Sequence, residues 1–155
     1  MIVEKSIQIA APPQAIWPFL TEPEKIMMWF DTFKKFECTS ECPSGLGTTY
    51  YVEEKVPGPL RKINFKAVSW DVDKLLVLSM TSGKNVNSYE IRWQLEENQS
   101  GTNFYFKEEV GMPFGPIGKM LGRIGQPTAD KMVANMLYKL KELSELSENH
   151  KTIYS

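Results

Sequence analysis

The chain has 155 residues, of which 42% are hydrophobic and 24% charged, and its net charge is −1. This length suits a single domain with a sizeable core. The sequence has no basic stripe and no apolar run of membrane-spanning length, which argues against a nucleic-acid-binding protein and an integral membrane protein. Its first residues also lack the apolar stretch of a signal peptide.

Cysteine and histidine are scarce, which limits the chemistry that we expect. Cys38 and Cys42 are too few for a disulfide scaffold, and they lack the second pair of ligands that a zinc site needs. We interpret them as reduced thiols, which predicts a cytoplasmic protein. The single histidine, His150, falls in a predicted C-terminal tail at 149–155. We therefore expect no catalytic triad, no metal ion and no cofactor.

The chain begins with a predicted strand at 2–9 and two short helices. The first helix follows Pro12 and Pro13, and the second ends near Trp29. Turn signals then separate six predicted strands, at 33–39, 47–56, 61–70, 75–80, 88–97 and 102–110. Alternation is clearest in 88–97, where Tyr89 and Trp93 share one side with other apolar residues. This pattern predicts an antiparallel sheet with one face exposed to solvent.

A long amphipathic helix is predicted near the C-terminus. Between 127 and 146, apolar residues recur at helical spacing. The preceding stretch, 114–126, carries Gly115, Gly118, Gly122 and Gly125. Each glycine inside a helix costs about 1 kcal/mol relative to alanine. Two interpretations are open: a lid or pocket mouth against which a ligand or backbone packs closely, or a loop with a short helical turn.

The order of elements predicts an α+β fold. About seven antiparallel strands with a single late helix bury their apolar sides only if the helix lies on one face of a curved sheet. This arrangement leaves room for a cavity between the sheet and the helix.

The stretch IAAPPQAIWPFL, from Ile9 to Leu20, continues to Pro23, Glu24 and Trp29. It resembles the opening of the START-like superfamily, also called Bet v 1-like or SRPBCC, which includes polyketide cyclase/dehydrase and lipid-transport proteins. The family's element order covers 1–148 as one domain. The resemblance implies a helix-grip fold, in which the sheet wraps the C-terminal helix. It also implies a cavity that binds hydrophobic or amphipathic small molecules such as lipids, sterols or polyketides.

Large apolar side chains on the expected inner surfaces are candidate ligand-binding residues. They are Trp29, Phe65, Met80, Tyr89, Trp93, Phe104, Phe106, Leu121, Met132, Met136 and Leu140. Methionine is flexible and polarisable, so a methionine-rich lining adapts to varied apolar ligands. The alternative for each residue is packing in a solid core.

Two glutamates occupy strand positions that face the same side of the sheet as the inward-facing apolar residues. Glu54 follows Val52 at spacing two, and Glu108 follows Phe106 in the same way. If both point to the concave side, burial raises the carboxyl pKa and suits a general acid or base in a cyclisation, dehydration or hydrolysis. The alternative is a bulge that turns either residue to solvent. Two interpretations apply to Arg61, Arg92 and Arg123: contact with an anionic head group at the mouth of a cavity, or a solvated surface position, which we favour.

Three functions therefore remain open. The first is binding or transport of a hydrophobic small molecule without catalysis. The second is a cyclase/dehydratase-type enzyme that uses an inward carboxyl group, Glu108 or Glu54. The third is a protein-interaction module, because some START-like relatives act on protein partners, including as co-chaperones. A pocket beside a desolvated carboxyl favours the second, and a filled core with an exposed apolar patch favours the third.

Overall fold

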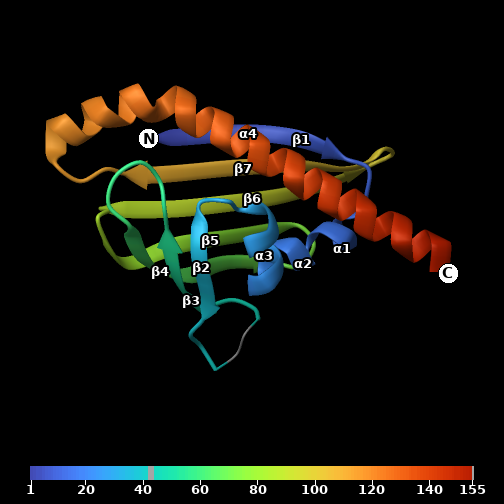
Figure 1. Cartoon of the computed structure of the whole chain (residues 1–155). Helices are drawn as coiled ribbons and strands as arrows, with labels where there is room; N and C mark the ends of the chain where they lie inside the picture. The colour runs from blue at the N-terminus through green and yellow to red at the C-terminus, as the bar shows by residue number, and fades with distance from the viewer. Residues whose placement is uncertain (42–43, 155) are drawn as a thin grey trace.

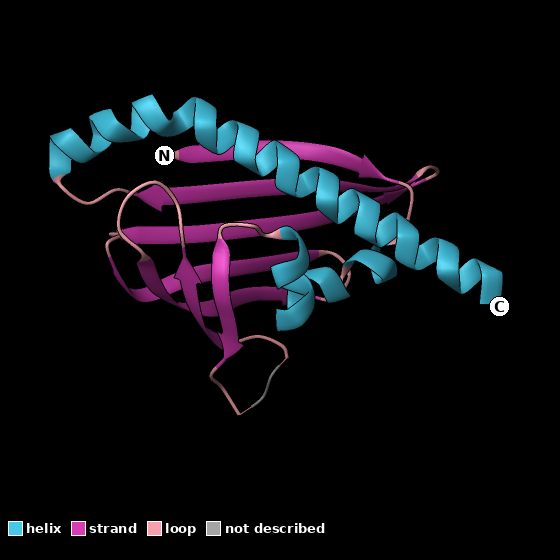
Figure 2. Cartoon of the chain, viewed as in Figure 1, coloured by secondary structure: helices cyan, strands magenta, loops and turns pink. Residues whose placement is uncertain are grey.

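A computed structural model of the chain describes residues 1–41 and 44–154, so Cys42 lies outside the described residues. Within this range the chain forms three short helices, seven strands and one long helix (Figures 1 and 2). The elements are β1 (Ile2–Ile9), α1 (Pro13–Ile16), α2 (Pro18–Thr21), α3 (Pro23–Trp29), β2 (Phe33–Cys38), β3 (Thr49–Glu54), β4 (Arg61–Asp71), β5 (Leu75–Lys84), β6 (Ser88–Asn98), β7 (Gly101–Gly111) and α4 (Gly115–Tyr154).

All described strands belong to one antiparallel sheet, in the order β1-β7-β6-β5-β4-β3-β2. The sheet is curled, and the helices pack on its inner face (Figure 1). Alternation along β6 follows the sequence, because Tyr89 and Trp93 are buried while Arg92 is exposed. The predicted α+β helix-grip architecture is confirmed.

The segment after β1 differs from the prediction in detail. It is interrupted at Trp17, between Ile16 and Pro18, so the first expected short helix is two single turns, α1 and α2. Pro18 has no amide hydrogen to continue the α1 ladder, which explains the break. The indole Nε1 of Trp29 donates a hydrogen bond to the Phe19 carbonyl oxygen at 2.7 Å and holds α3 against α2.

The long helix α4 settles the nature of the glycine-rich stretch. It runs without interruption from Gly115 to Tyr154, so the loop interpretation of 114–126 is wrong, and the helix continues beyond the predicted tail boundary at 148. Pro127 lies inside it. In Figure 1 the first part arches away from the sheet and the second part crosses the fold. Helix propagation from the apolar second part offsets the poor propensity of the first.

The core beneath α3 and the second part of α4 is packed with aromatic rings. Trp29 lies 5.5 Å from Trp93 and 6.3 Å from Phe104, measured between ring centroids, and all three are fully buried. Phe30 and Phe106 join the same cluster at 6.1 Å. Aromatic rings therefore pack against one another at the centre of the fold.

Neither edge of the sheet is a regular, open strand: β1 is covered by α4, and β2 is irregular. At β1, Gln126 Nε2 donates to the Ile2 carbonyl oxygen at 2.7 Å, and Lys141 Nζ donates to the Gln8 carbonyl oxygen at 3.0 Å. Thus α4 covers the outer edge of β1. At the other edge, β2 presents exposed Lys34 and Lys35, and its pairing with β3 is irregular between Phe33 and Lys35.

Candidate functional site

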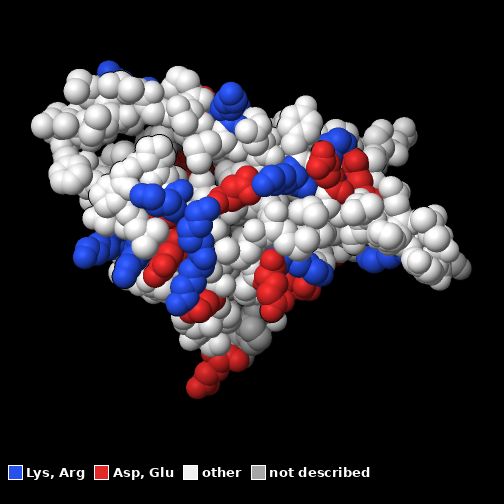
Figure 3. All heavy atoms as spheres, in the orientation of Figure 1, with Lys and Arg blue, Asp and Glu red and all other residues white. Residues whose placement is uncertain are grey.

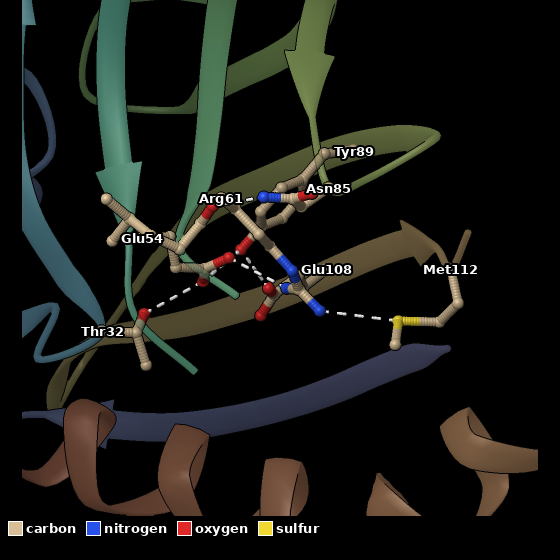
Figure 4. Close-up of polar contacts among 8 residues, drawn as sticks. Thr32, Glu54, Arg61, Asn85, Tyr89, Glu108 and Met112 are labelled. Atoms are coloured by element: carbon tan, nitrogen blue, oxygen red, sulfur yellow. Dashed lines mark hydrogen bonds and ion pairs between the residues drawn. The ribbon is translucent and has the colours of Figure 1, made fainter. Parts of the chain in front are cut away.

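Two carboxyl groups meet inside the fold. Glu54 ends β3 and is 1% exposed, and Glu108 lies in β7 and is 8% exposed. The inward direction predicted for both is confirmed by their burial. They gather around Arg61 from β4 and Tyr89 from β6 (Figure 4). These four residues are called the carboxyl cluster below.

The strand register explains how Glu54 is held. β3 and β4 pair so that Glu54 lies directly opposite Arg61. Arg61 Nη1 donates to Glu54 Oε2 at 2.9 Å, and both side chains are nearly inaccessible to solvent. The Thr32 hydroxyl donates to Glu54 Oε1 at 3.1 Å. A buried carboxylate that is paired and hydrogen-bonded in this way is satisfied.

Tyr89 connects the two carboxyl groups. Its hydroxyl lies 3.0 Å from Glu54 Oε1 and also forms a short hydrogen bond with Glu108 Oε1. Burial, followed by the nearby charges of Glu108 and Glu54, raises the pKa of Tyr89 well above its usual value, so the phenol keeps its proton. One phenolic hydrogen serves one carboxylate at a time. The contact with the second carboxyl group is a hydrogen bond only when that group carries a proton, which it can donate to the phenol oxygen.

Glu108 is the carboxyl group that takes this proton. Burial, and then the charge of Glu54, raise the pKa of Glu108 from 4.5 to about 8, although the Tyr89 hydrogen bond and Arg61 act in the opposite direction. At neutral pH, Glu108 is therefore mainly an uncharged acid next to a tyrosine. This is the state that a general acid needs.

A pocket of about 600 Å³ opens beneath the first part of α4, next to the cluster. The surface is hollowed at this place in Figure 3. The lining comes from the start of the chain, the β5–β6 connection, the end of β7, the segment after it and α4: Met1, Asn87, Val110, Gly111, Met112, Gly115, Lys119, Gly122, Arg123 and Gln126. This volume is within the range of small-molecule sites.

The pocket and the carboxyl cluster share a boundary. Met112 lines the pocket, and its Sδ lies 3.5 Å from Arg61 Nη2 (Figure 4). Val110 also lines the pocket, and Glu108 is the next inward-facing position along β7. The carboxyl cluster therefore lies next to the pocket, although none of its four residues belongs to the lining.

The glycines of α4 explain why there is space. Gly115 and Gly122 line the pocket, where larger side chains would occupy it. Gly118 has another role, because a Cβ there would lie 1.9 Å from the Pro113 carbonyl oxygen. The helix can start this close to the preceding segment only with glycine at that position.

The predicted ligand-binding side chains mostly lie elsewhere. Trp29, Phe65, Tyr89, Trp93, Phe104, Phe106, Met136 and Leu140 are buried, and Met80 and Met132 are half-buried. Leu121 is 50% exposed on the outer side of α4. None of these residues belongs to the pocket lining given above, although Tyr89 belongs to the adjacent carboxyl cluster.

Sequence reasoning missed two residues of the site. Arg61 is 5% exposed, so its interpretation as a solvated surface residue is wrong. The turn at Pro57-Gly58-Pro59 could have indicated the position of Arg61, because pairing the strands on its two sides sets Arg61 opposite Glu54. Thr32 lies in the connection between α3 and β2, and no sequence pattern pointed to it.

The architecture defines a helix-grip domain. The profile described as "Polyketide cyclase / dehydrase and lipid transport" matches residues 1–145. The chain belongs to this family. Among curated proteins, none matches the sequence significantly.

Solved structures share the fold at low sequence identity. A protein from Thermus thermophilus is 17% identical with a TM-score of 0.77, and the match covers 93% of this chain and 97% of that chain. A protein from Nitrosomonas europaea is 18% identical with a TM-score of 0.71, covering 96% and 97%. A START superfamily protein from Mycobacterium smegmatis is 14% identical with a TM-score of 0.67, covering 96% and 97%. These similarities show the fold alone.

Proposed function

We propose that the protein binds a hydrophobic or amphipathic small molecule, of the lipid or polyketide kind, in the pocket beneath the first part of α4. The observation that carries the proposal is the glycine-lined side of this helix facing a pocket of about 600 Å³. Glycines lower helix stability, so the presence of Gly115 and Gly122 on the pocket side favours a role in leaving space. The family's description is consistent with such a ligand.

The pocket also has the mixed character of an amphiphile site. Val110 and Met112 give apolar walls, and Asn87, Gln126 and Arg123 supply polar groups. An amphiphile places its chain against the former and its head group against the latter. The cytoplasmic location expected from the cysteines stays a prediction.

Filling the pocket tests the proposal. We expect Gly122→Trp to weaken binding of the fluorescent fatty acid cis-parinaric acid by about tenfold or more, because the indole occupies the space that the ligand needs. The measurement is a fluorescence titration, preceded by native mass spectrometry and extraction of any compound carried through purification. A Cβ at Gly122 is 3.6 Å from Met112 Cγ, so the substitution starts from an ordinary contact.

Gly125→Trp is the matched control. Gly125 is in the same helix, does not line the pocket, and has no heavy atom within 4 Å of an added Cβ. We expect this variant to bind like the wild type. Equal binding by both variants would show that the ligand is held elsewhere.

The protonated carboxyl group of Glu108 favours a second candidate, a cyclase/dehydratase-type enzyme. An uncharged acid next to a pocket is suited to protonate a leaving hydroxyl group or a carbonyl oxygen if a ligand reaches past Met112. We expect Glu108→Gln to retain an extracted compound but to abolish its chemical conversion, measured by mass spectrometry of the compound over time. A compound that the wild type returns unchanged would leave binding as the function.

A further inference from the structure

The outward side of the first part of α4 is apolar and exposed. Phe114, at the start of the arch, is 76% exposed, and Ile117 and Ile124 are 62% and 69% exposed. Met120 and Leu121 are also exposed large hydrophobic residues. From Ile117, the helical residues follow at spacings of three, four and seven, so they share one side of the helix. We call Phe114, Ile117, Met120, Leu121 and Ile124 the apolar arch.

The apolar arch lies opposite the pocket. Gly118 and Gly122, four residues apart, are buried, and Gly122 lines the pocket. The first part of α4 therefore has its large apolar side chains on the outward side and glycines on the side that faces the protein. Leaving five large apolar side chains together in water is unfavourable, which indicates a surface that something covers.

The charges near the apolar arch all have one sign. From 110 to 129, Lys119 and Arg123 are the only charged residues, whereas the whole chain has a net charge of −1. In the part of the chain that the structure describes, neither side chain forms an ion pair. In Figure 3 this part of the molecule is mostly white. Both side chains are exposed and border the pocket, so they lie on the polar side of the helix. An exposed apolar side with cations on the polar side is typical of helices that lie in the interface of an anionic membrane.

We propose that the apolar arch docks onto the surface of a bilayer that contains anionic lipids. Its side chains enter the boundary between head groups and acyl chains, and Lys119 and Arg123 contact the anionic head groups. No helix among the described residues is long and apolar enough to cross a membrane, so the contact is peripheral.

Vesicle flotation with the full chain tests the proposal. We expect the protein to float with vesicles of phosphatidylcholine and phosphatidylglycerol, and to bind less as salt increases or as phosphatidylglycerol is removed. The double variant Ile117→Ser and Ile124→Ser should reduce binding by about tenfold or more, because it removes two large apolar contacts. Replacing Lys119 or Arg123 with Gln should reduce binding about fivefold each, the usual effect of one basic residue at an anionic surface.

The control removes two exposed valines from another part of the surface. Val68 and Val72 are 47% and 58% exposed, so Val68→Ser with Val72→Ser makes a comparable change outside α4. This variant should float like the wild type, and circular dichroism should show that all variants are folded. Absence of flotation at low salt, or equal flotation of the Ile117/Ile124 variant, would overturn the proposal. So would a dimer of the wild type, in light scattering, that the same double variant dissociates.

Discussion

Replacing Arg61 with methionine is expected to reduce the free energy of unfolding by about 3–5 kcal/mol, the usual effect of removing one partner from a buried ion pair. Arg61 and Glu54 are both almost completely buried, and Arg61 is the cation that faces the two carboxyl groups of the cluster. Without Arg61, Glu54 is left with an uncompensated charge close to Glu108. Urea unfolding followed by circular dichroism measures the change.

Two further variants make this expectation specific. Arg92→Met removes an exposed arginine from the outer side of the same sheet and should change the unfolding free energy by no more than about 0.5 kcal/mol. Adding Glu54→Gln to Arg61→Met removes the orphaned charge and should recover a large part of the loss. If Arg61→Met is no worse than Arg92→Met, the buried ion pair does not stabilise the fold.

The second large effect is a pH dependence that comes from Glu108. The pKa of this carboxyl group is about 8 in the folded protein and 4.5 as the ordinary value. Between these values the folded protein holds a proton that the unfolded chain has released. Stability is therefore highest at low pH within this window and falls as the pH rises towards 8. The loss between pH 5 and 8 is on the order of 3–5 kcal/mol.

Glu108→Gln separates this effect from all other titrations. Glutamine keeps the shape of the protonated carboxyl group but does not ionise, so the unfolding free energy of the variant should change much less between pH 5 and 8. The comparison needs urea unfolding at several pH values for both proteins. Parallel curves for the wild type and Glu108→Gln would show that Glu108 is ionised in the folded protein at neutral pH.

The sequence predicted the parts of this site that depend on strand periodicity. Glu54 and Glu108 continue alternating apolar patterns, and alternation specifies which side of a sheet a residue faces. It does not specify which residues meet across the sheet. Arg61 was missed because arginine is rarely fully buried unless it is paired, and its partner is set by the register of a hairpin.

The pocket could not be predicted for a different reason. Large apolar residues on the inner surfaces were expected to line it, but Trp29 and Trp93 fill the centre. The space lies instead where α4 arches over β7 with glycines turned inward. The sequence showed those glycines but did not distinguish a helix from a loop, because local propensity disfavours helix there. This stretch is helical because α4 continues into it from its apolar second part.

The covering of β1 by α4 has a consequence for the behaviour of the chain in concentrated solution. An uncovered edge strand is a template onto which a strand of another molecule can add, and growth of this kind leads to aggregation. Gln126 and Lys141 occupy carbonyl oxygens on the β1 edge, and lysines with an irregular pairing protect the β2 edge. The helix that shapes the pocket thus also keeps separate molecules from joining their sheets.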